Sequence, residues 1–142
     1  MPELPVSSLA PGQCAQLRAY DVITGEDVVL LESRDVRLEA PNWALDGQNL
    51  VVNGDGHLYR VPLRSPELQR IALTGLPPLN NHQVLDPDGE HIFVSAMDFQ
   101  LYRAPLAGGQ AVRLTNPATT PLMHFLHGVS PDGRRLAFVG VM

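Results

Sequence analysis

Three Asp-Gly pairs recur along the chain at nearly constant spacing, and they constrain the fold more than any other feature. They are Asp46-Gly47, Asp88-Gly89 and Asp132-Gly133, which lie 42 and then 44 residues apart. Each pair stands between two short apolar segments, where Asp and Gly favour tight hairpins because they accept positive φ angles. A repeat of strands and turns with this period is typical of β-propeller blades.

A second motif marks the third strand of each repeat. Residues 58–63 read Leu-Tyr-Arg-Val-Pro-Leu and residues 101–106 read Leu-Tyr-Arg-Ala-Pro-Leu, so five of the six positions are identical. We expect this strand near the outer side of a sheet, because Pro62 and Pro105 lack the N–H donor that an inner ladder needs. A further short strand ends in Leu-Thr in both repeats. The complete repeat is therefore predicted to be a four-stranded antiparallel sheet.

The two ends of the chain contain partial repeats. Residues 17–31 align with a third and a fourth strand, whereas residues 124–141 supply only a first and a second strand. The prediction is an all-β chain with about three blades' worth of sheet. It comprises a lead-in at 1–14 and a partial propeller at 15–142, whose blades divide as 15–35, 36–75, 76–116 and 117–142. Thirteen prolines and twelve glycines, spread throughout, argue against sustained helices.

These motifs resemble those of the TolB-like, WD-like β-propeller family. The resemblance rests on the Pro-Asp-Gly motif within residues 130–138, Ser-Pro-Asp-Gly-Arg-Arg-Leu-Ala-Phe, and on the two Leu-Tyr-Arg strands. It implies four-stranded blades around a central channel, commonly about six in number, so that this chain would supply half of a ring.

Three interpretations account for half a ring. The chain is the front half of a longer product, or two copies close one six-bladed ring as a homodimer, or the arc stays open. The open arc is the least favoured of the three, because bare sheet edges promote association.

Charge and hydropathy exclude several classes of partner. The formal net charge of −5 argues against broad nucleic-acid binding, which needs a positive surface. No apolar run approaches the roughly 20 residues that a membrane span requires.

The first eight residues lack the basic start and apolar core of a signal peptide. A cytoplasmic protein is therefore expected, or a periplasmic one if a leader precedes this sequence. The single cysteine, Cys14, is interpreted as an ordinary thiol.

Candidate ligand residues precede the Asp-Gly turns, because the first strand of each blade would line the channel. The amides and imidazoles there suit a small polar ligand or a protein. The tryptophan among them suits either stacking on a ligand or packing between blades. These channel-face candidates are Trp43, Asn80, Asn81, His82, His124 and His127.

The histidines raise a second hypothesis, in which His82, His124 and His127 bind a divalent metal or act as acid and base. Against it, His82 lies six residues before its turn aspartate and His127 only five, which predicts side chains on opposite sides of their strands. No carboxylate accompanies the histidines in that window. The alternative is that His82 and His127 form hydrogen bonds with the backbone of neighbouring blades. The Asp-Gly aspartates are likewise interpreted as turn residues that bind local N–H groups.

The sequence favours a non-catalytic module that binds a protein or a small polar ligand and needs no cofactor. Two alternatives remain open. One is a metal-dependent enzyme or sugar-acid-binding propeller resembling the oligogalacturonate lyases, which would use the channel histidines. The other is the propeller part of a larger hydrolase of the prolyl-oligopeptidase type, although the Gly-x-Ser-x-Gly motif of such enzymes is absent from this chain.

Overall fold

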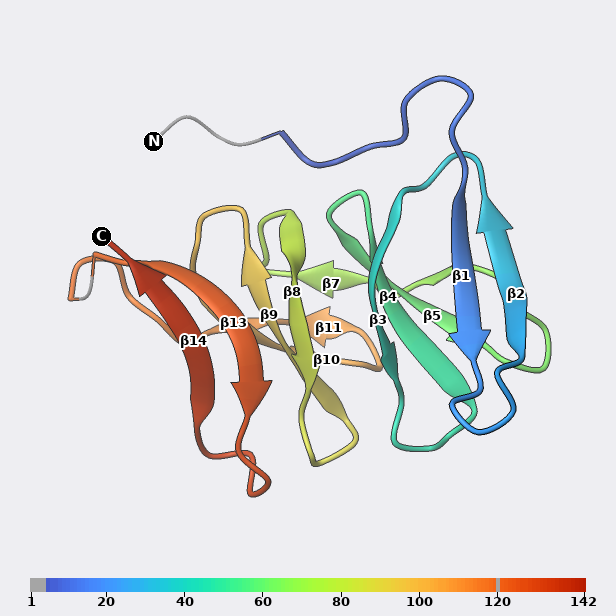
Figure 1. Ribbon diagram of the computed structural model, residues 1–142. Coiled ribbons are helices and arrows are strands. Elements are labelled where there is room, and N and C mark those ends of the chain that lie inside the picture. Colours follow the sequence, from blue (N-terminus) through green and yellow to red (C-terminus); the bar gives the residue numbers. More distant parts are fainter. Residues whose placement is uncertain (1–4, 120) are drawn as a thin grey trace.

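Residues 5–119 and 121–142 are described by a computed structural model, in which they form strands and turns without any helix (Figure 1). Four antiparallel sheets follow one another in chain order and stand side by side (Figure 1). They contain two, four, four and two strands. The predicted all-β class with four-stranded antiparallel sheets is therefore confirmed. No helix in the described ranges has the length and apolar character that a membrane span requires.

The first two sheets come from residues before the second Asp-Gly turn. The first sheet pairs β1 (Ala15–Tyr20) with β2 (Asp27–Ser33). The second runs in the order β3 (Leu38–Trp43), β4 (Asn49–Gly54), β5 (His57–Pro62) and β6 (Gln69–Arg70). Its outer strand therefore lies slightly earlier in the chain than the predicted strand that ends in Leu-Thr.

The third and fourth sheets repeat this order. The third contains β8 (Leu79–Leu85), β9 (His91–Ala96), β10 (Leu101–Pro105) and β12 (Val112–Arg113). The fourth pairs β13 (Met123–Val129) with β14 (Leu136–Val141). The motif strands β5 and β10 hold the third place in their sheets, as the Leu-Tyr-Arg pattern predicts.

A short parallel ladder joins the two four-stranded sheets. It pairs β7 (Leu73–Thr74) with β11 (Gly109–Gln110), and the N–H of Gly109 donates to the Ala72 carbonyl at 2.9 Å. Gly108, just before this ladder, has a φ of 90°, and a Cβ there would lie 3.1 Å from the Ala72 oxygen. Only glycine allows the two connections to approach so closely.

Apolar side chains fill the spaces between neighbouring sheets. Successive residues of a strand point to opposite faces, so β4 serves two interfaces. Leu50 and Val52 pack toward Leu17 of the first sheet, whereas Val51 packs toward Ile92 and Val94 of the third. A third cluster joins the last two sheets through Phe93, Leu101 and Leu126. Both faces of each central strand are therefore buried, which explains their continuous apolar runs.

The Asp-Gly pairs form the hairpin turns that the sequence predicts. The glycines have φ angles between 67° and 75°. Each aspartate accepts a hydrogen bond from the N–H two residues further on: Gln48 to Asp46 (2.7 Å), Glu90 to Asp88 (2.8 Å) and Arg134 to Asp132 (3.0 Å). The hydrogen bond from the Gln48 N–H contributes most to lowering the pKa of Asp46. The aspartates thus hold turns, in agreement with their interpretation as structural residues.

Candidate ligand site beside the inner strands

A pocket of about 410 Å³ lies where the inner strands β3, β8 and β13 meet the N-terminal segment. Residues 5–7 form one side of it, and Figure 1 shows the N-terminal segment running past the ends of β8 and β3 on its way to β1. The side chains that can orient a ligand there are Arg37, Glu39, Asn80, Asn81, His82 and Phe125. The structure thus gathers three of the predicted candidates, Asn80, Asn81 and His82, at one pocket.

An ion pair supplies the charge of this pocket. The Nε of Arg37 lies 3.0 Å from the Oε1 of Glu39, and the Glu39 carboxylate is the more buried of the two. The pair lies just before an irregular stretch of β3, in which Ala40 has a φ of 48° and the pairing with β4 shifts register between Glu39 and Asn42. Glu39 lines the pocket while its backbone pairs with Asn53 of β4.

Asn80 is a positioning residue for its own strand. Its Nδ2 donates to the Ser95 hydroxyl at 2.9 Å, and its Oδ1 accepts the N–H of His82 at 2.9 Å. The register of β8 against β9 shifts between Leu79 and Gln83, so these bonds replace part of the regular ladder. Asn81, within the same irregular stretch, is exposed.

His82 and His127 meet between neighbouring sheets. Their ring centroids lie 5.1 Å apart with the planes at 81°, and Phe125 contacts His82 at 5.6 Å. The expectation that opposing registers argue against a shared site is therefore wrong. Since β8 and β13 contact each other in the fold, side chains on opposite sides of the two strands can point into the same space. The register shift between Leu126 and Gly128 also places His127 in a bulge.

The environment of His82 favours its neutral form. Burial is the largest cause that lowers its pKa, and the nearby His127 lowers it further. A hydrogen bond with the Leu126 backbone acts in the opposite direction. At neutral pH His82 therefore offers the pocket an uncharged imidazole.

His124 occupies a different environment from the other two histidines. It is only 1% exposed, and its Nδ1 lies 2.8 Å from the Phe99 carbonyl. Its own carbonyl accepts the Ser95 hydroxyl at 2.7 Å, and its ring lies against Phe138. These contacts make His124 a buried link between the last two sheets and separate it from solvent.

The described residues do not fit the metal hypothesis for the three histidines. His82 and His127 are in contact, but His124 uses its Nδ1 on a backbone carbonyl. Within residues 5–119 and 121–142, the one group of three potential ligands is Asp86, Asp88 and His91. Both carboxylates there are already paired with a cation, because Arg103 lies 2.8 Å from Asp86 and 2.7 Å from Asp88.

Trp43 does not contribute to the pocket. It ends β3 at the hairpin and is 54% exposed, whereas Glu39 lies near the start of the same strand.

Three parts of the pocket were not predicted from the sequence: Arg37, Glu39 and residues 5–7. The repeat spacing could have indicated Glu39, which precedes Asp46 by seven residues much as His82 precedes Asp88 by six. No local signal marks residues 5–7, because a folded contact alone brings them to the pocket.

Comparisons with known proteins agree with this fold. No protein-family model matches the sequence. The chain is 33% identical over 108 residues to an uncharacterized protein of Agrobacterium fabrum, an alignment that covers 72% of this chain and 36% of the relative. It also matches a solved protein of Agrobacterium tumefaciens described as a candidate TolB, with a TM-score of 0.77 and 29% identity, over 87% of this chain and 44% of the other. The chain thus has a TolB-like propeller fold and spans less than half the length of each.

Proposed function

We propose that the chain is a non-catalytic propeller module that binds a protein or a small polar ligand at the pocket beside the inner strands. The observation that carries this proposal is the convergence of Arg37 and Glu39 with Asn81 and His82 on one space of about 410 Å³. These residues come from two neighbouring sheets, so the folded arrangement and not a single motif creates the pocket.

The chemistry of the pocket suits a ligand that carries both donors and acceptors. Arg37 and Glu39 provide a cation and an anion, and the neutral His82 and the amide of Asn81 can each donate or accept. Phe125 adds an apolar wall. A few polar groups beside an aromatic surface are typical of sites that orient small ligands.

A titration series with polar probes tests this proposal. The full chain labelled with 15N would be titrated with galacturonate, free arginine and a neutral disaccharide. We expect at least one probe to shift the amide signals of Asn81 and His82 in a saturable way. Asn81→Ala should weaken that binding, whereas Asn116→Ala, at an exposed loop outside the pocket, should not.

Protein binding at the same place requires a separate measurement, because a large partner contacts more than the pocket. A chain with Arg37→Glu should lose a partner that binds there, while Arg135→Glu at the distant β13–β14 hairpin should keep it. If neither the probes nor a partner depend on Arg37 or Asn81, the proposed site is wrong.

We also propose that further propeller strands cover the two end sheets. Val28 and Val29 of β2 are 40% and 45% exposed, and Phe138, Val139 and Val141 of β14 are 40–55% exposed. Such apolar residues are normally buried between blades. The two similar proteins are more than twice as long as the segments they share with this chain, which supports additional repeats as the source of the covering strands. A second copy of this chain is the alternative source of those strands.

A further inference from the structure

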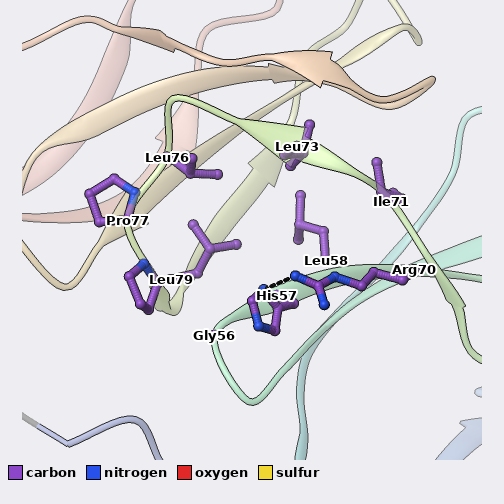
Figure 2. A pocket seen from close by; sticks show the side chains of 10 residues that line it. Gly56, His57, Leu58, Arg70, Ile71, Leu73, Leu76, Pro77 and Leu79 are labelled. Atoms are coloured by element: carbon purple, nitrogen blue, oxygen red, sulfur yellow. Dashed lines mark hydrogen bonds between the residues drawn. The ribbon is translucent and has the colours of Figure 1, made fainter.

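A second cavity, separate from the proposed ligand pocket, lies between the two four-stranded sheets. Its volume is about 160 Å³, and it opens beside the start of β5. Figure 2 shows side chains from β5, β7 and the start of β8 converging on one space. The apolar walls are Leu58, Ile71, Leu73, Leu76 and Leu79.

One side of this cavity is polar. The Nη2 of Arg70 lies 3.0 Å from the Nδ1 of His57, and the dashed line in Figure 2 marks this contact. A guanidinium can only donate, so the Nδ1 of His57 is the acceptor and its neutral ring carries the proton on Nε2. Burial is the largest cause that lowers the pKa of His57, the charge of Arg70 lowers it further, and Asp55 raises it.

The charge of Arg70 has no carboxylate partner among the described residues. The ion pairs within ranges 5–119 and 121–142 involve other arginines and His91. Arg113, the corresponding residue of the third sheet, faces Tyr102 in its ladder as Arg70 faces Tyr59. The charge of Arg113 acts to lower the pKa of Tyr102, whereas Arg70 donates to His57 at the cavity.

We propose that this cavity binds a small apolar carboxylate, whose hydrocarbon body lies among the leucines and whose carboxylate lies against Arg70 and His57. A guanidinium favours a carboxylate because its planar donors match the two oxygens. The volume sets the size, since an apolar cavity of about 150 Å³ holds a benzene ring and therefore a body of roughly four to seven carbon atoms. A nucleotide or an oligosaccharide is too large for this space.

The test uses benzoate and 3-methylbutanoate as acids and benzamide as the uncharged analogue of benzoate. Leucine methyl signals of the full chain would be followed by NMR during each titration. We expect both acids to shift the methyls of Leu58, Leu73 and Leu76 with dissociation constants around millimolar. Benzamide should bind more weakly, and benzoate should raise the pKa of His57 because the anion offsets the charge of Arg70.

Two matched variants make the test specific. Arg70→Gln should weaken benzoate binding by about tenfold or more while leaving that of benzamide unchanged. Arg113→Gln should bind benzoate like the native chain. The proposal is overturned if neither acid gives a saturable shift, if benzamide binds as tightly as benzoate, or if Arg70→Gln and Arg113→Gln have equal effects. Because this cavity shares no polar residue with the proposed ligand pocket, each can fail without the other.

Discussion

The rings of His82 and His127 meet edge to face across two neighbouring sheets, with their centroids 5.1 Å apart. Each ring is held on an inner strand at a place where the ladder is irregular. Charge on His127 lowers the pKa of His82, because like charges at this separation repel. The contact therefore lets a residue of the fourth sheet affect the protonation of His82 in the third, although these two sheets share no ladder.

His82 should titrate below the ordinary range of histidine, and His127→Gln should raise its pKa by removing one of the two causes that lower it. A pH series of 1H–13C spectra of the imidazole signals measures this directly. His91→Gln, at the Asp88 turn, is the matched control and should leave His82 unchanged. A pKa of His82 that stays the same in the His127 variant would contradict the coupling.

Stability should decline as the pH falls below about 6.5, the ordinary pKa of an unfolded histidine. The folded pKa values of His57 and His82 are both lowered, so the unfolded chain binds more protons in this window and acid favours unfolding. Urea denaturation between pH 7 and pH 5 measures the effect. A variant carrying both His57→Gln and His82→Gln should show a flatter dependence, and an equally steep one would refute this explanation.

Asp86→Asn should destabilise the third sheet by about 1–3 kcal/mol, the range for losing a buried charge-assisted hydrogen bond. Asp86 is 5% exposed, and its carboxylate accepts Arg103 Nε at 2.8 Å and the N–H of Asp88 at 3.1 Å. The midpoint of urea denaturation at constant slope gives the change. Asp132→Asn, at an exposed turn, should shift that midpoint far less, and equal shifts would show that the buried ion pair contributes little.

The isolated chain should associate through its end sheets, because β2 and β14 expose apolar side chains. Sedimentation at increasing concentration should give masses above the 15.5 kDa of one chain. Val139→Glu should reduce this association, whereas Val112→Glu, at an exposed site on the outer strand of a complete sheet, should not. A clean monomer would exclude the two-copy ring.

The repeat units could be predicted because their signals are local. The Asp46, Asp88 and Asp132 hairpins depend on residues within a few positions of each other, and the structure shows the same turn geometry at all three. The alternation of apolar residues likewise indicates strands without knowledge of their neighbours.

The pocket could be predicted only in part, because its walls come from separate segments. Asn80 and His82 were found through their place on an inner strand, but Arg37 and residues 5–7 reach them only in the folded chain. The contact between His82 and His127 was misjudged for a related reason. A count along each strand gives the side of that strand, and it says nothing about which strand lies opposite.

The parallel ladder between β7 and β11 has a consequence for how the molecule opens. It joins the connections that leave the second and third sheets, with Gly109 bound to Ala72 and Ala111 bound to Thr74. Neither four-stranded sheet can detach without breaking these bonds, so the two should unfold as one cooperative unit. The fourth sheet is also tied to the third, because the N–H of His124 donates to the Phe99 carbonyl at 3.1 Å. The first sheet has no such bond to its neighbour among the described residues, and its amides should exchange with solvent through local opening long before those of the centre.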